Sequence, residues 1–137
     1  VFKVPSELSD EAVTAVNCAV SQVIYGLEIG GARMGDNIVI QGAGGLGLYA
    51  AAAARDMGAS QVIVIDGLAN RLEMARNCGA DHTIDINEYD DAHVENYIKK
   101  NHFDFVLLGT IVTHYKWVKW FVNMIKKHQS IPKSYMN

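Results

Sequence analysis

The sequence predicts a doubly wound α/β fold, in which helices cover both faces of a parallel sheet. Short runs of continuous apolar residues alternate with longer segments of helical periodicity, and a glycine-rich loop joins the first such pair. Strands whose apolar residues do not alternate with polar ones are buried on both faces, which is typical of parallel sheets. Right-handed crossovers then give the strand order 3-2-1-4, a partial sheet of this class.

Local signals place each element. Ser9 precedes Asp10 and Glu11, and a helix cap followed by first-turn carboxylates predicts a helix that runs to about Leu27. Glycines end most of the later segments. The other expected elements are strands at 37–41, 61–66, 82–85 and 103–108, a helix that follows the loop at 42–47 and runs to about 57, and helices at about 70–78, 91–100 and 115–127.

Length and composition limit the class of protein. The chain has 137 residues, of which 50% are hydrophobic and 20% charged, with a mean hydropathy of +0.05, so it can bury a core. Two cysteines, Cys18 and Cys78, are too few for a disulfide scaffold. Without an apolar run of ~18 residues or a signal-peptide pattern, we expect no membrane span and a cytoplasmic location. A net charge of -3 predicts no attraction to nucleic acid.

The composition changes near residue 96. Residues 1–96 carry 14 acidic and 5 basic side chains, whereas residues 97–137 carry 1 acidic and 7 basic ones and no alanine. We interpret 1–137 as one incomplete domain with a distinct C-terminal segment, which is either a lysine-rich helix or an ending of different origin, such as a frameshift. Trp117 and Trp120 beside lysines would suit a membrane- or partner-binding helix, but packing on the sheet is favoured.

The loop from Gly42 to Gly47 fits the pattern G-x-G-x-x-G and lies between an expected strand and an expected helix. In that context Gly42 permits a tight turn, Gly44 lets the backbone approach a pyrophosphate, and Gly47 brings helix and strand close together. Free amides at the helix start then face the phosphates. The candidate phosphate-binding residues are Gly42, Gly44, Gly45, Leu46 and Gly47.

Asp66 ends the second expected strand, 19 positions after Gly47. A carboxylate there accepts both hydroxyls of an adenosine ribose and repels a 2′-phosphate, which favours NAD over NADP. Arg71, one helical turn further on, either lies along the ribose or is simply solvated. A methyltransferase that uses S-adenosylmethionine is an alternative, although such enzymes usually carry an acidic residue where Gln41 stands.

A series of short motifs follows a specific order along residues 1–95. They are Val4-Pro5 with Leu8-Ser9-Asp10-Glu11, Asn17-Cys18-Ala19, Tyr25-Gly26, Gly35-Asp36, Val39 to Gly47, Val64-Ile65-Asp66 and Gly79 to Asp85. Together they resemble the cofactor domain of the zinc-dependent alcohol and polyol dehydrogenase branch of the medium-chain dehydrogenase/reductase superfamily. The resemblance implies a Rossmann-like fold and, in the whole enzyme, hydride transfer between a small alcohol and NAD.

The resemblance also implies roles for individual residues. The glycines and Asp66 would bind NAD, Arg71 would lie beside the ribose, and Gly109 and Thr110 would line the nicotinamide side. Cys18 would be the third protein ligand of a catalytic zinc, although a lone cysteine on an apolar helix face is more often a buried hydrophobe.

The part of the family that carries the remaining zinc ligands would precede Val1. We therefore expect the chain to be an NAD-binding domain truncated at both ends, from an enzyme that forms a homo-oligomer. The alternative is a stand-alone nucleotide-binding or regulatory module that has no catalytic half.

Overall fold

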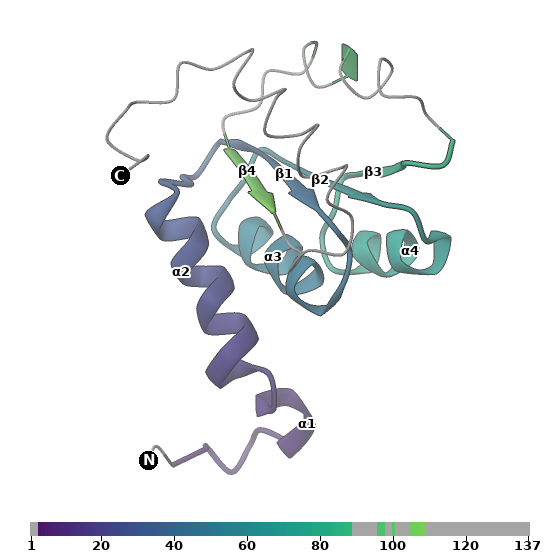
Figure 1. The fold of residues 1–137 in the computed structure, drawn as a ribbon. Coiled ribbons are helices and arrows are strands. Elements are labelled where there is room, and N and C mark those ends of the chain that lie inside the picture. Colours follow the sequence, from purple (N-terminus) through teal and green to yellow (C-terminus); the bar gives the residue numbers. More distant parts are fainter. Residues whose placement is uncertain (1–2, 89–95, 98–99, 101–104, 109–137) are drawn as a thin grey trace, which may run out of the picture.

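The computed structural model describes residues 3–88, 96–97, 100 and 105–108, and its centre is a parallel sheet (Figure 1). The sheet has four strands in the order β3-β2-β1-β4, so the predicted order is confirmed. All three strand pairings are parallel. The strands are β1 (Asn37–Gln41), β2 (Gln61–Asp66), β3 (His82–Asp85) and β4 (Phe105–Leu108).

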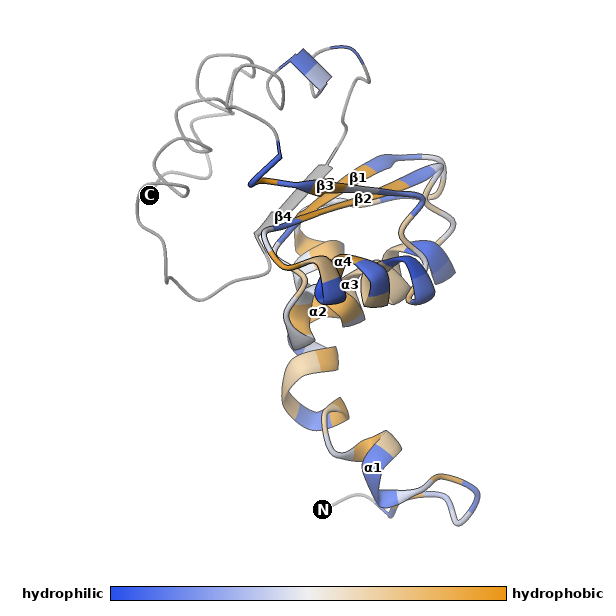
Figure 2. Ribbon diagram, turned by 90° about the vertical axis from the view of Figure 1, so that its right-hand side faces the viewer, coloured by the Kyte–Doolittle hydropathy of each residue, from blue (hydrophilic) through white to orange (hydrophobic). Residues whose placement is uncertain are grey.

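Helices α3 (Gly45–Asp56) and α4 (Ala69–Asn77) pack against one face of the sheet, and α2 (Ser21–Ile29) packs against α3 on the same side, as Figure 2 shows. Alternate residues of the strands point to this face, since side chains along a strand alternate between its two sides. Ile38 and Ile40 therefore join Val62 and Val64 in the larger core cluster. Alanines 50, 51 and 54 are fully buried in the same cluster, which lets α3 approach the strands closely.

The intervening strand residues form a second core cluster on the opposite face of the sheet. It consists of Val39, Ile63, Ile65 and Ile84, with Tyr97 packed against it. Burial on both faces explains why the strands are continuously apolar. Residues 96, 97 and 100 are helical, within the helix predicted at 91–100. The rest of that helix, the helix predicted at 115–127 and the start of the strand predicted at 103–108 lie outside the described residues.

The prediction of one continuous helix from Ser9 to Leu27 is wrong. The segment consists of α1 (Asp10–Val13), a π-helical turn (Val16–Val20) and α2. Ser9 caps α1 as expected, since its hydroxyl accepts the Ala12 amide. The Thr14 hydroxyl then donates to the carbonyl of Asp10, and the Ser21 hydroxyl donates to the carbonyls of Asn17 and Cys18. Such hydroxyl bonds compete with the regular backbone ladder and disturb a helix.

The same segment also meets a simple criterion for a membrane-spanning helix. Asp10–Ile29 is 20 residues long, and its length and composition alone would allow it to cross a membrane. The criterion is weak, because core helices of soluble proteins and signal sequences also meet it. Val23 and Leu27 of this segment are buried in the larger core cluster. The expectation of no membrane contact stays a prediction.

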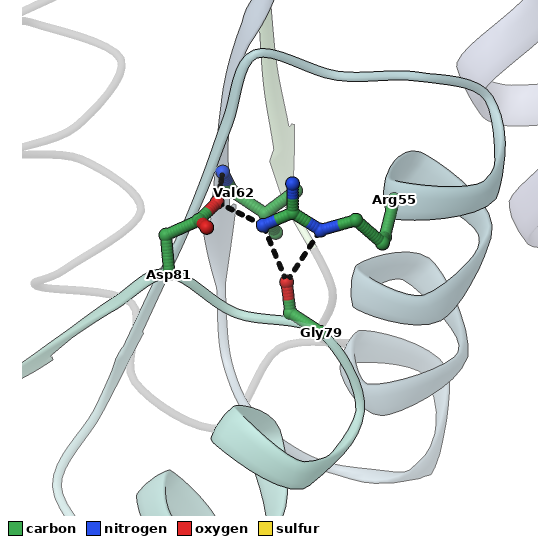
Figure 3. A network of polar contacts seen from close by, with 4 residues as sticks. All are labelled: Arg55, Val62, Gly79 and Asp81. Atoms are coloured by element: carbon green, nitrogen blue, oxygen red, sulfur yellow. Dashed lines mark hydrogen bonds and ion pairs between the residues drawn. The ribbon is translucent and has the colours of Figure 1, made fainter.

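A polar network holds the far end of α3 to the turn before β3 (Figure 3). Arg55 donates from Nε and a terminal nitrogen to the carbonyl of Gly79, over 3.3 and 3.2 Å, and forms an ion pair with Asp81. Asp81 also accepts the amide of Val62 in β2 over 2.8 Å. Burial disfavours the charged carboxylate, but the bonds from Arg55 and the Val62 amide outweigh that effect and lower the pKa of Asp81. The network thus fixes α3, whose other end begins at the glycine loop.

We expect Asp81→Asn to lower the free energy of unfolding at pH 7 by roughly 0.2–1 kcal/mol, since both partners of the ion pair are partly exposed. A carboxylate whose pKa is lowered by folding stabilises the protein above its unfolded pKa of about 3.9, and that contribution is lost as the pH falls through the folded value. The difference between variant and parent should therefore begin to shrink below about pH 4 and disappear only below the folded pKa of Asp81. Urea unfolding at several pH values, with exposed Glu73→Gln as the control, measures it. A difference that is as large at pH 3 as at pH 7 would contradict this account.

Candidate functional site

The loop between β1 and α3 turns sharply, and its geometry requires glycine at two positions. Gly42 has a φ of 95°, a conformation in which a side chain would be strained. Its amide donates to the carbonyl of Ile65 over 2.7 Å, which ties the loop to β2. A Cβ atom on Gly47 would lie 1.7 Å from the carbonyl oxygen of Gly42. The helix and the loop can therefore approach this closely only where residue 47 has no side chain.

The other two glycines of the loop face open space. A Cβ atom built on Gly44 or Gly45 would meet no described atom within 4 Å beyond the adjoining chain. Gly44 caps α3 without a side-chain hydrogen bond, so the first amides of the helix are left without an intrahelical acceptor. Such amides, at the positive end of a helix dipole, suit an anionic phosphate. The loop therefore fits a dinucleotide that approaches Gly44, Gly45 and Leu46.

Asp66 lies beside this loop, at the carboxyl end of the adjacent strand. Its Oδ2 atom accepts the Ala43 amide over 2.7 Å, and its Oδ1 atom accepts the Leu68 amide over 2.9 Å. The side chain is partly exposed, so its remaining lone pairs can be reached from solvent. The structure thus brings the candidate ribose acceptor and the candidate phosphate loop together at one edge of the sheet.

The turn that follows Asp66 is held by a residue that the sequence analysis missed. Asn87 lies after β3, and its Nδ2 atom donates to the carbonyl of Gly67 over 2.7 Å and to Asp85 over 3.0 Å. The Asn87 amide also donates to Asp85, over 2.8 Å. A Cβ atom on Gly67 would lie 3.1 Å from Asn87 Nδ2 and from Ile86 Cδ1. The signal that could have revealed this contact is Asp85-Ile86-Asn87, since paired Asp and Asn residues after a strand favour such turns.

The remaining residues singled out in the sequence lie outside the pairing of the glycine loop with Asp66. Arg71 is exposed in the first turn of α4, and its amide donates to the carbonyl of Leu68. It therefore follows directly on the turn that Asp66 holds. Cys78 packs against the larger core cluster. Gly109 and Thr110 lie outside the described residues.

Cys18 is exposed in the π-helical turn, so within this chain its thiol is not part of the core. Its sulfur accepts a hydrogen bond from Gln22 Nε2 over 3.6 Å. Within the part of the chain that the structure describes, no group of three His, Cys, Asp or Glu side chains could hold a metal ion. A catalytic zinc needs three protein ligands, so these residues by themselves do not fit one.

Comparisons with known proteins agree with this architecture. The family described as "Zinc-binding dehydrogenase" matches residues 45–114, just over half of the chain. The chain is 38% identical over 86 residues to 5-exo-hydroxycamphor dehydrogenase of Pseudomonas putida, a match that covers 62% of this chain and 24% of that protein. The chain spans about a quarter of the length of the curated relatives it matches.

The fold of the chain is also similar to that of solved dehydrogenase structures. Alcohol dehydrogenase TADH from Thermus sp. ATN1 superposes with a TM-score of 0.76 at 30% identity, covering 90% of this chain and 35% of that one. A protein of Sinorhizobium meliloti 1021 described as a zinc-binding dehydrogenase bound to NADP gives a TM-score of 0.60 at 29% identity, covering 65% and 26%. Neither the methyltransferase nor the stand-alone module finds support among these relatives. The chain belongs to the zinc-binding dehydrogenase family, within the alcohol and polyol dehydrogenases of the medium-chain superfamily.

Proposed function

We propose that this chain binds NAD(H) at the carboxyl ends of β1 and β2, as the dinucleotide-binding part of a zinc-type alcohol dehydrogenase. The observation that carries the proposal is the 2.7 Å hydrogen bond between the Ala43 amide and Asp66, because it sets the ribose acceptor directly beside the phosphate-binding amides. Ligands of open parallel sheets bind at this edge, outside the carboxyl ends of the strands.

Each part of the site has a separate task. The amides that begin α3 would bind the pyrophosphate. Because glycine has no side chain, the pyrophosphate could approach the backbone closely at Gly44 and Gly45. Asp66 would accept the ribose hydroxyls and so fix the adenosine half of the cofactor. When bound, the cofactor supplies the acceptor for a hydride taken from the substrate. The contribution of this chain is therefore to hold and orient the cofactor.

The charge of Asp66 favours NAD over NADP. A 2′-phosphate would have to approach a carboxylate whose two oxygen atoms already accept amides from two sides, which holds the negative charge in place. The similar protein of Sinorhizobium is bound to NADP, so membership of the family does not by itself imply a preference for NAD. Asp66 is the residue of this chain that decides between them.

We expect the chain to bind NADH and to prefer it to NADPH, and we expect Asp66→Ala to weaken NADH binding by roughly 10–100-fold. The variant loses charge-assisted hydrogen bonds to the ribose, which are about twice as strong as neutral ones. NADPH should be affected less, because the same substitution removes the repulsion of its 2′-phosphate. Titration of NADH and NADPH followed by cofactor fluorescence measures both affinities.

Glu73→Ala is the matched control, because it removes one exposed carboxylate from α4 and should leave both affinities unchanged. A folded parent chain that binds no NADH would overturn the proposal. So would a parent chain that binds NADPH more tightly than NADH.

Further features of the whole enzyme belong to the same proposal. The substrate is a small alcohol, and the whole enzyme is a homo-oligomer with a cytoplasmic location. Among the residues of this chain, Cys18 is one ligand of a catalytic zinc. Gly109 and Thr110 line the nicotinamide side, and Arg71 lies at the ribose. The family description, zinc-binding dehydrogenase, supports the zinc, and the alcohol dehydrogenases among the similar proteins support the alcohol. The exposed thiol of Cys18 supports its role as a ligand, because it is free to meet groups from another part of the enzyme.

A further inference from the structure

Two consecutive amides of the glycine loop are held by two consecutive residues of β2. The Gly42 amide donates to the backbone carbonyl of Ile65, and the Ala43 amide donates to the side chain of Asp66, both over 2.7 Å. The backbone ladder between β1 and β2 ends at the pair Gln41 and Ile65. The Asp66 carboxylate thus supplies an additional rung, at the point where the chain leaves the sheet and turns toward α3.

The bond to Asp66 satisfies a donor that has little access to water. Ala43 is only 1% exposed and belongs to the larger core cluster. A buried amide that loses its acceptor destabilises the conformation in which it is buried. Without the carboxylate, loop conformations in which water reaches the Ala43 amide become favoured. In such conformations the neighbouring amides, which face the ligand, are displaced.

We propose that Asp66 is also a positioning residue for the phosphate loop, so that it supports binding of the pyrophosphate as well as of the ribose. This inference rests on the proposed binding of NAD(H). The two tasks are compatible, because an ionised carboxylate offers about four lone-pair sites and the two amides occupy two of them. Two sites remain for the 2′- and 3′-hydroxyls, and hydrogen bonds that share one carboxylate are coupled to each other.

A cycle of protein and ligand changes separates the two tasks. The ligands are NADH and an NADH analogue whose adenosine ribose lacks both hydroxyls, each titrated against the parent chain, Asp66→Ala and Asp66→Asn. We expect Asp66→Ala to bind the dideoxy analogue roughly tenfold more weakly than the parent chain does, a change equal to one lost buried hydrogen bond. Asp66→Asn should recover part of this loss, since its amide oxygen can still accept the Ala43 amide.

Hydrogen exchange without any nucleotide gives a second measurement that does not depend on NAD binding. In NMR spectra of the folded chain, Asp66→Ala should accelerate exchange of the Ala43 amide, while Gly42, whose acceptor is the backbone carbonyl of Ile65, is affected less. Glu73→Ala is the control, because it removes an exposed carboxylate from α4 and leaves the residues of this turn in place.

The outcomes distinguish this inference from the proposed function. If Asp66→Ala binds the dideoxy analogue as tightly as the parent chain, or if exchange of the Ala43 amide is unchanged, the positioning role is wrong and only the ribose contact remains. If the folded parent chain binds no NADH, the proposed function is wrong, and the exchange measurement alone decides whether Asp66 positions the loop. Equally fast exchange at Ala43 in Glu73→Ala would also count against the positioning role.

Discussion

Gly47→Ala should abolish NADH binding and lower the free energy of unfolding by roughly 3 kcal/mol, which corresponds to a fall in Tm of about 10 °C. The added methyl group would lie 1.7 Å from the carbonyl oxygen of Gly42 and 2.9 Å from its carbonyl carbon. Both are backbone atoms of a turn that is tied to β2, so the loop or the helix must move as a whole. Thermal unfolding and NADH titration measure the two effects.

Two variants of neighbouring glycines are the controls. Gly45→Ala adds a methyl group in open space at the start of α3, so it should leave the Tm unchanged or raise it slightly. Gly44→Ala should lower NADH affinity more than it lowers stability, because its methyl group would point to the side from which the pyrophosphate approaches. A Gly47→Ala variant that binds NADH normally would show that the close packing at this turn is unnecessary.

Leu27→Ala should lower the free energy of unfolding by about 2–5 kcal/mol, the range for a fully buried leucine. Leu27 is 0% exposed and packs in the larger core cluster, on the helix that continues from the turn carrying Cys18. The loss would show that this N-terminal helix is anchored to the sheet. Chemical denaturation followed by circular dichroism measures the change.

Ile24→Ala on the same helix is the matched control for Leu27→Ala. Ile24 is 48% exposed, so its loss should change stability by less than about 1 kcal/mol. Equal effects of the two substitutions would mean that this helix does not face the sheet as described.

Much of the fold could be predicted from local patterns. The strands at 37–41, 61–66 and 82–85 have the expected bounds, because each is a short apolar run between glycine or polar turn residues. Helix α3 begins inside the glycine loop, at Gly45, and ends one residue before the expected end, whereas α4 begins and ends one residue earlier than expected. The N-terminal helix was predicted poorly for a physical reason, since apolar spacing does not show that the Thr14 and Ser21 hydroxyls bond to backbone carbonyls.

The site could be predicted in its parts but not in its connections. Glycine spacing and a strand-ending carboxylate marked the loop and Asp66, because each signal is local in the sequence. The bond between Ala43 and Asp66 joins residues 23 apart, and the bond between Asn87 and Gly67 joins residues 20 apart. Contacts of this kind depend on how neighbouring strands align, which no single segment encodes.

The sequence by itself determined the class of fold, the order of the strands, the phosphate loop and the residue types available to a dinucleotide. It could do so because apolar runs, glycine spacing and the handedness of crossovers act over short distances or as general rules. Only the tertiary structure decided that Gly47 meets the Gly42 carbonyl, that Cys18 is exposed, and that Asp66 joins the ribose edge to the phosphate loop. Those facts arise from the packing of separate segments against one sheet, where distance in space no longer follows distance along the chain.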